Sequence, residues 1–125
     1  MEKPSLGQAM DGAAAEDAAR PLAALEALPA RRALPCLVDG RPVLLYRQGT
    51  GVRAVVNRCP HVGTPLDLSP GNVFTLDGRH LICATHGALF EPDSGLCVSG
   101  PCKGRALEII PLLVRDGQVW PAGRA

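Results

Sequence analysis

Aromatic side chains are scarce in this sequence: Phe, Trp and Tyr make up only 3% of its 125 residues. A core with so few large rings must be built mainly from Val, Leu and Ile. Histidine is also scarce, at three residues, which excludes an elaborate catalytic apparatus based on histidine. With five cysteines, however, three histidines are enough for one metal site.

Long apolar runs and a strong net charge are also lacking. The longest apolar stretch, Leu107 to Val114, is interrupted by Glu108 and Pro111 and falls short of the roughly 18 residues of a membrane span. The N-terminus has no apolar core of a secretory signal. A net charge of +1 is not the basic excess of a nucleic-acid-binding protein. We therefore expect a soluble, cytoplasmic protein whose partners include neither nucleic acid nor a membrane.

The composition changes near residue 20 and predicts two parts. Residues 1–19 are rich in Ala and carry four acidic residues against Lys3. They are typical of a flexible tail, with a short helix expected at Gly12–Arg20. Residues 20–125 form the expected domain and keep 12 basic against 8 acidic residues, an excess that suits either a solvated surface or an acidic redox partner.

Beyond residue 20, short β-prone runs alternate with Gly- and Pro-containing turns about every ten residues. Asp-Gly pairs at 39–40, 77–78 and 116–117 are typical of hairpin turns. The pattern predicts an all-β fold. The expected strands are Pro21–Ala24, Arg32–Val38, Pro42–Arg47, Val52–Asn57, Val73–Leu76, Arg79–Cys83, Ala88–Glu91, Arg105–Arg115 and Gln118–Pro121, with one helical turn at Leu25–Pro29.

Two short segments carry the metal-binding chemistry. Cys59-Pro60-His61 and Cys83-Ala84-Thr85-His86 each pair one Cys with one His, and each follows an expected strand. Two thiolates and two imidazoles can bind zinc tetrahedrally, but zinc modules usually pair like with like within a loop. The mixed pairs suit a binuclear cluster better, with both thiolates on one iron and both imidazoles on the other.

The sequence resembles the Rieske iron–sulfur family over about residues 20–121. The resemblance includes Asn57, Pro60, Gly63 and Leu66 around the first motif, Gly87 and Phe90 after the second, and the later Asp93-Ser94-Gly95 and Gly100-Pro101. It implies antiparallel sheets with two cluster-binding loops at one end. It also implies one [2Fe–2S] cluster per chain, with Cys59 and Cys83 on one iron and His61 and His86 on the other. Gly63 and Gly87 would allow the backbone to turn near the cluster.

Several residues depart from the respiratory members of this family. Thr64 and Thr85 stand where those proteins carry a second, disulfide-forming pair of cysteines, and Ala88 and Phe90 replace a Ser and a Tyr that hydrogen-bond the cluster. The resemblance is therefore to soluble Rieske-type ferredoxins. Without those donors, we expect a reduction potential between about −150 and 0 mV.

The resemblance implies an electron carrier and not an enzyme. It would accept one electron from a reductase and pass it to a terminal oxidoreductase such as an oxygenase. A mononuclear iron site needs two histidines and a carboxylate, and only His80 remains, so oxygen chemistry would belong to a partner. The alternatives are a small subunit of a larger reductase, such as a nitrite reductase, and a redox-sensing module.

The remaining cysteines and cations have weaker signals. Cys36 lies in an apolar strand and is expected to pack in the core. Cys97 and Cys102 are expected to pack near the cluster, with a local disulfide as the alternative. Lys103 and Arg105 suggest a positively charged rim, and His80 an exposed strand residue.

Overall fold

Almost all regular structure in the computed structural model is β-strand, which confirms the predicted all-β class. The structure describes residues 20–60, 63–67, 69–85 and 87–122. Within these ranges the strands are β1 (Ala23–Ala24), β2 (Leu34–Val38), β3 (Arg41–Gln48), β4 (Gly51–Val56), β5 (Leu81–Ile82), β6 (Leu89–Phe90), β7 (Cys97–Ser99), β8 (Leu112–Arg115) and β9 (Gln118–Pro121), with one 3₁₀ turn at Leu25–Ala27. In the part of the chain so described, no helix is long and apolar enough to cross a membrane. The helix expected at Gly12–Arg20 falls almost entirely outside the described residues.

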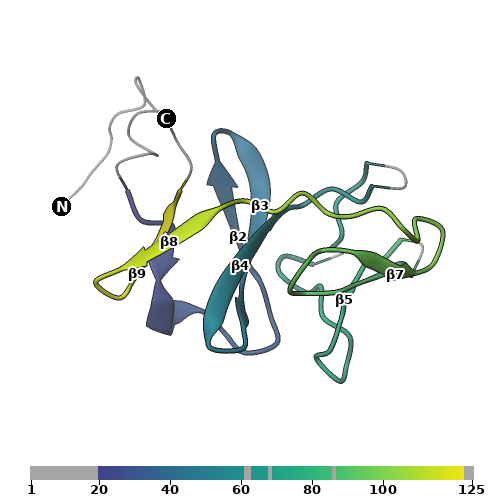
Figure 1. Cartoon of the computed structure of the whole chain (residues 1–125), viewed down its shortest axis with the longest axis horizontal. Coiled ribbons are helices and arrows are strands. Elements are labelled where there is room, and N and C mark those ends of the chain that lie inside the picture. Colours follow the sequence, from purple (N-terminus) through teal and green to yellow (C-terminus); the bar gives the residue numbers. More distant parts are fainter. Residues whose placement is uncertain (1–19, 61–62, 68, 86, 123–125) are drawn as a thin grey trace.

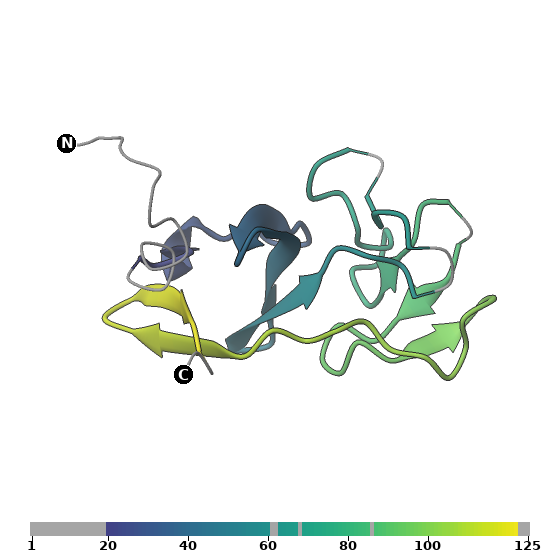
Figure 2. The ribbon, with the colours of Figure 1, turned by 90° about the horizontal axis from the view of Figure 1, so that it is seen from above.

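The strands form three antiparallel sheets of three strands each, in the orders β1-β9-β8, β2-β3-β4 and β5-β6-β7. Figure 1 shows the first two sheets together at one end of the molecule and the β5–β7 sheet, with its loops, at the other. The chain crosses between the ends twice, after β4 and again after β7, as Figure 2 shows from above. The loops that carry the cysteine motifs therefore lie at the β5–β7 end.

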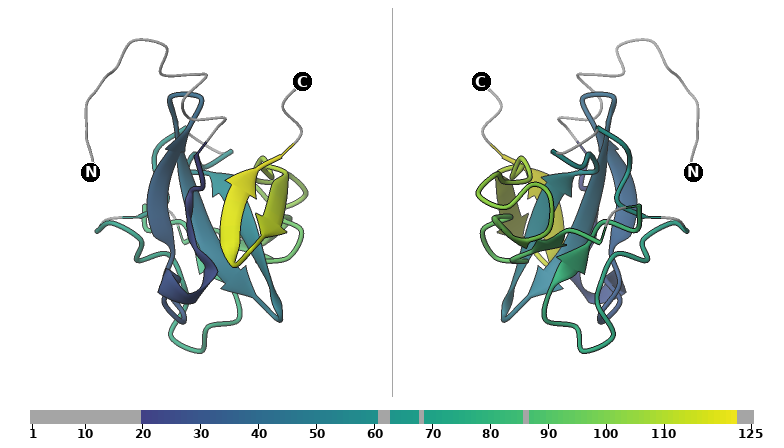
Figure 3. Two further views of the ribbon diagram at one scale, coloured as in Figure 1. Left: turned by 90° about the vertical axis from the view of Figure 1, so that its left-hand side faces the viewer. Right: turned by 90° about the vertical axis from the view of Figure 1, so that its right-hand side faces the viewer.

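The central sheet, β2-β3-β4, is buried on both faces because its middle strand is apolar without interruption. Side chains alternate along a strand, so Leu44 and Tyr46 face one core while Val43 and Leu45 face the other. The first core includes all four cysteines of the β5–β7 end, and the second includes Val119 of β9. The end-on views of Figure 3 show the β8–β9 hairpin against the central sheet. One face of the central sheet thus packs against the β5–β7 end of the molecule.

Two of the predicted Asp-Gly turns join strands in the expected way. At the β2–β3 and β8–β9 turns both central residues have positive φ: 55° and 78° at Asp39-Gly40, and 54° and 72° at Asp116-Gly117. This conformation matches the twist of a two-residue hairpin. At Asp77-Gly78 the flanking strands are much shorter than predicted, with only a Phe74–Leu81 bridge and the two residues of β5.

The long strand predicted over Arg105–Arg115 is wrong. Only Leu112–Arg115 is a strand, and the preceding residues make isolated bridges, Leu96 to Ala106 and Val55 to Ile109. Pro111 has no N–H to continue a ladder. The segment instead follows the edge of β4, where the Glu108 carbonyl accepts from the Val56 N–H at 2.9 Å. Strand β7 was not predicted from the sequence.

Candidate [2Fe–2S] site

Loop 1, residues 57–66, begins where β4 ends and contains Cys59. The Cys59 N–H donates to the Thr64 carbonyl at 2.8 Å, and the Gly63 N–H donates back to the Cys59 carbonyl at 2.7 Å. Gly63 has a φ of 81°, which L side chains rarely adopt. The two hydrogen bonds and the glycine close a tight turn that holds Cys59 at its base.

Loop 2, residues 83–88, repeats the same turn after β5. The Cys83 N–H donates to the Ala88 carbonyl at 2.9 Å, and the Gly87 N–H donates to the Cys83 carbonyl at 2.8 Å. Gly87 has a φ of 73°. Each cysteine therefore lies four residues before a left-handed glycine and in the same backbone environment, although the two loops differ in sequence.

A backbone hydrogen bond joins the two loops directly. The Ala84 N–H, next to Cys83, donates to the Leu66 carbonyl at the end of loop 1, at 2.9 Å. Leu66 is also held from the other side, because its N–H donates to Asn57 Oδ1 at 2.7 Å. The loops that carry the two cysteines are thus one connected unit.

Asn57 and Asp67 form a polar bracket behind loop 1. Asn57 Nδ2 donates to Asp67 Oδ1 at 2.9 Å, and Asp67 Oδ2 accepts from the Gly71 N–H at 2.9 Å. Asn57 was part of the family pattern in the sequence, but the role of Asp67 was missed. Its only sequence signal is its position one residue after Leu66.

Loop 3, residues 100–105, packs against both of the others. Gly100 approaches loop 2 so closely that a Cβ there would lie 2.8 Å from Ala88 Cα. From the far side of loop 3, Arg105 Nη1 donates to the Pro60 carbonyl of loop 1 at 3.0 Å. The proline-containing loop expected from the sequence is therefore in place beside the two motifs.

Four cysteines are buried together in the core beneath these loops. Cys59, Cys83, Cys97 and Cys102 are each at most 2% exposed and belong to one apolar cluster. Cys102 Sγ lies 3.0 Å from Cys97 Sγ, and burial, followed by the contacts with Cys97 and Cys59, raises the pKa of Cys102 to about 12. Cys97 and Cys102 were expected to pack near the cluster; the structure shows Cys102 in contact with Cys59, and their position relative to a cluster stays a prediction.

Cys36 and His80 do not belong to these loops. Cys36 packs against the other apolar core, and burial raises its pKa to about 11. His80 is half-buried, 3.5 Å from Glu91 through its Nε2, and lies outside the strands, so the exposed strand position predicted for it is wrong.

The structure describes two of the four predicted ligands. Cys59 and Cys83 are placed as above, whereas His61 and His86 fall outside the described residues. Among the residues that are described, no cluster of three or more His, Cys, Asp or Glu has the arrangement of a metal site. The assignment of Cys59, His61, Cys83 and His86 as the four ligands is therefore a proposal.

The two described cysteines fit iron ligation on chemical grounds. A buried thiolate is costly without a positive partner, and a metal ion supplies that charge. Both thiols lie at the base of matching turns, each two or three residues before a histidine in the sequence. Ala88 and Phe90, both fully buried beside loop 2, have no side-chain donor to offer a cluster.

Comparison with known proteins agrees with this geometry. The Rieske [2Fe-2S] domain matches residues 19–114. The chain belongs to the Rieske [2Fe-2S] domain family. The domain binds a [2Fe–2S] cluster, so the predicted fold, family and cofactor are confirmed.

Within the Rieske family, two curated relatives differ greatly in length. Ferredoxin CarAc of Metapseudomonas resinovorans is 34% identical over 86 residues, which cover 69% of this chain and 75% of that protein. The oxygenase component of chloroacetanilide N-alkylformylase from Rhizorhabdus wittichii is 43% identical over 65 residues. Those residues make up 51% of this chain but only 17% of the oxygenase component.

A solved Rieske structure shares the fold over most of both chains. The ferredoxin of carbazole 1,9a-dioxygenase from Nocardioides aromaticivorans IC177 superposes with a TM-score of 0.69 at 24% identity, covering 84% of this chain and 97% of that one. The similarity extends over almost all of that ferredoxin, and thus over both ends of the molecule in Figure 1.

Proposed function

We propose that this chain is a Rieske-type ferredoxin, a one-electron carrier between a reductase and a terminal oxygenase. The observation that carries the proposal is the pair of matching turns at Cys59 and Cys83, joined by the Ala84–Leu66 hydrogen bond within a Rieske domain. The similarity to ferredoxin CarAc over three quarters of that protein supports a carrier over an enzyme.

In this proposal Cys59 and Cys83 hold one iron and His61 and His86 the other. When bound, the cluster supplies a site that takes up and releases a single electron. The chain does no bond chemistry. Its turns fix both cysteines, its core excludes water from their sulfur atoms, and the absence of side-chain donors at Ala88 and Phe90 favours a low potential.

A cytoplasmic location completes the proposal. The sequence has five cysteines, of which only two are assigned to the cluster. A reducing compartment suits this composition because the remaining thiols stay reduced there. Cys97 and Cys102, although 3.0 Å apart, are both thiols.

The ligand assignment is tested by single substitutions on the purified holoprotein. We expect two irons per chain, absorption between about 450 and 600 nm and an EPR signal on reduction. Cys59→Ser and Cys83→Ser should lose the cluster, and His61→Ala and His86→Ala should lose or alter it. Cys36→Ser, at a cysteine in the other core, is the matched control and should keep it. Zinc in place of iron, or a full cluster in Cys59→Ser, would overturn the proposal.

The carrier role is tested by the proteins that copurify with the chain and by turnover. A carrier should cycle many times between a flavin reductase and an oxygenase while bound to each only transiently. Stoichiometric copurification with a large nitrite reductase subunit would favour the subunit alternative. Partner affinity that depends on cluster oxidation, without turnover, would favour a sensor.

A further inference from the structure

Three exposed cations surround loops 1 and 3 at the candidate cluster site: Arg58, Lys103 and Arg105. We propose that this cationic rim is the docking surface for a carboxylate-rich face of a redox partner. The inference rests on the proposed carrier function and adds the chemistry of the partner.

Two of the cations are held directly on loop 1. Arg105 reaches across from loop 3 and donates through Nη1 to the Pro60 carbonyl, next to Cys59, at 3.0 Å. Arg58 lies against the turn itself, since a Cβ on Gly63 would meet its Nε at 3.4 Å. Both guanidinium groups are therefore positioned by the turn that holds a cluster cysteine, and each keeps N–H donors for a carboxylate.

Lys103 is the third cation and lies in loop 3. It directly follows Cys102, whose thiol contacts Cys59 and Cys97. Its backbone N–H donates to the Gly100 carbonyl at 3.2 Å, so the loop that carries it is closed on itself and packed against Ala88. The Lys103 side chain is exposed and makes no ion pair with a carboxylate among the described residues.

The carboxylates of the same part of the chain are occupied elsewhere. Glu108 lines the hollow beside Arg58 but accepts two hydrogen bonds from Arg41, at 3.0 and 3.1 Å. The other described carboxylates between residues 57 and 108 likewise have partners other than the three cations: Asp67 with Asn57 and Gly71, Asp77 with Thr75 and Arg79, Glu91 with His80, and Asp93 with Arg53. Among the described residues, the ion pairs of these carboxylates and of Glu108 are with Arg41, Arg53 and His80 and not with the cations of the rim.

A local charge of this kind matters because the chain as a whole is nearly neutral, at +1. A partner that presents carboxylates to this face is attracted to it, which orients the encounter as well as speeding it. Such attraction between exposed charges is screened beyond about 10 Å at 0.1 M salt. Docking by the rim should therefore weaken steeply as salt is added.

The first test is binding of poly-L-glutamate to the holoprotein, measured by calorimetry at low salt. Lys103→Glu should weaken binding about tenfold, and Arg58→Glu by a similar factor. Arg115→Glu is the matched control, because it makes the same change of net charge at the β8–β9 end of the molecule, and it should weaken binding less than about twofold. Equal weakening by all three variants, or tighter binding to duplex DNA than to poly-L-glutamate, would overturn the rim as a protein-docking surface.

The second test uses two small oxidants of opposite charge on the reduced protein. Ferricyanide takes one electron as an anion, and tris(phenanthroline)cobalt(III) takes one as a cation. Lys103→Glu should slow ferricyanide about tenfold and speed the cobalt complex, while Arg115→Glu should change neither by more than about twofold. If Lys103→Glu changed the rates of oxidation by the anionic and the cationic oxidant in the same way, the proposal would be overturned.

The carrier function and the docking rim can be disproved separately. If the purified protein holds no [2Fe–2S] cluster, the proposed carrier function is lost, while poly-L-glutamate binding to that protein as purified still tests the rim. If the cluster assembles and cycles but neither test distinguishes Lys103→Glu from Arg115→Glu, only the rim is wrong.

Discussion

Gly100 in loop 3 packs directly against Ala88 in loop 2, with no room for a side chain between them. A Cβ on Gly100 would lie 2.8 Å from Ala88 Cα and 3.2 Å from its Cβ. The contact fixes the proline-containing loop to the turn that holds Cys83. Because Gly100 has no side chain, two segments twelve residues apart in the sequence can pack in direct contact.

Gly100→Ala should therefore loosen the cluster end of the molecule. The variant combines a φ of 103° with a steric clash, and we expect a loss of about 2–4 kcal/mol in unfolding free energy. Gly104→Ala is the matched control, because Gly104 has a φ of 93° but nothing within 4 Å of a Cβ, and it should lose only about 1–2 kcal/mol. The stability of both variants can be measured by urea unfolding and by the rate at which the cluster absorption is lost on heating. Equal losses of unfolding free energy in the two variants would contradict a role for the Gly100–Ala88 contact.

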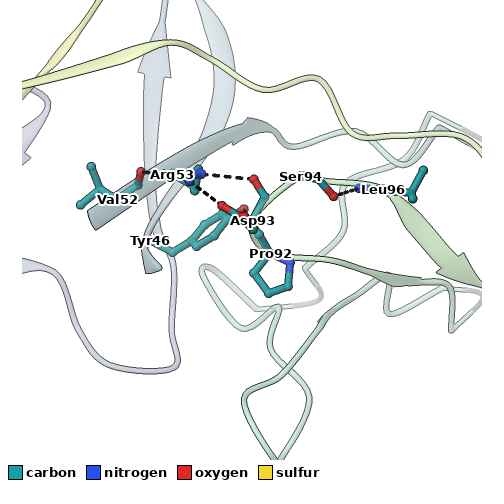
Figure 4. A network of polar contacts seen from close by, with 7 residues as sticks. All are labelled: Tyr46, Val52, Arg53, Pro92, Asp93, Ser94 and Leu96. Atoms are coloured by element: carbon teal, nitrogen blue, oxygen red, sulfur yellow. Dashed lines mark hydrogen bonds and ion pairs between the residues drawn. The ribbon is translucent and has the colours of Figure 1, made fainter. Parts of the chain in front are cut away.

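Tyr46 connects the central sheet to the cluster end. Its hydroxyl donates to the buried Pro92 carbonyl at 2.6 Å, and Arg53, opposite it on β4, pairs with Asp93 (Figure 4). Tyr46→Phe keeps the ring and its edge-on contact with Phe74 but leaves that carbonyl without a donor. We expect a loss of about 1–3 kcal/mol in urea unfolding.

Ser94→Ala is the control for Tyr46→Phe, since Ser94 is an exposed acceptor in the same turn (Figure 4). It should cost less than about 0.5 kcal/mol. If the Tyr46→Phe variant were as stable as Ser94→Ala, the hydrogen bond from Tyr46 to the Pro92 carbonyl would make no contribution to the free energy of unfolding.

Cys36 should make the protein less stable at alkaline pH. Its pKa is about 11 in the fold because burial disfavours the thiolate, whereas in the unfolded chain it ionises near 8.5. The unfolded state therefore loses its proton first, so this contribution is intact below about pH 8.5 and is lost as pH rises toward 11. Cys36→Ala should be less stable than wild type at pH 7, with a gap that narrows toward pH 11. Parallel stability curves would refute the burial effect.

The reduction potential should lie between about −150 and 0 mV. Ala88 and Phe90 are buried beside loop 2 and offer no hydroxyl to the cluster. Protein-film voltammetry measures the potential directly. A value above about +200 mV would mean that other donors stabilise the extra electron.

Cys97 and Cys102 should resist thiol reagents in the folded protein. They are 1% and 2% exposed, and the pKa of about 12 keeps Cys102 protonated at neutral pH. We expect slow labelling by an aromatic disulfide reagent in buffer and complete labelling in denaturant. A mass lower by two hydrogens in the purified protein would instead reveal the local disulfide.

The sequence alone was sufficient for the local features. Asp39-Gly40 and Asp116-Gly117 predicted their hairpins because the two-residue turn requires positive φ, which these residues tolerate. The Cys59 and Cys83 motifs predicted two loops after two strands, and both begin where β4 and β5 end. Gln118–Pro121 was predicted with the bounds that β9 has.

The failures occurred where partners far along the chain decide the structure. Arg105–Arg115 has the composition of a strand, but Leu107 and Ile110 enter different cores and Glu108 pairs with Arg41. Strand β7 exists because Cys97 pairs with Phe90 and its N–H donates to Arg105, neither of which is visible in a local pattern.

Membership of the Rieske family could be recognised from the sequence itself, since residue types and their spacing in the two Cys–His motifs are properties of neighbouring residues. Tertiary structure decided how the site is assembled. The Ala84–Leu66 hydrogen bond, the Gly100–Ala88 contact and the reach of Arg105 to Pro60 join segments 12 to 45 residues apart. Such contacts depend on how the central sheet brings the loops together, so the sequence could suggest cations near the site, but only the folded chain shows Arg105 donating to loop 1.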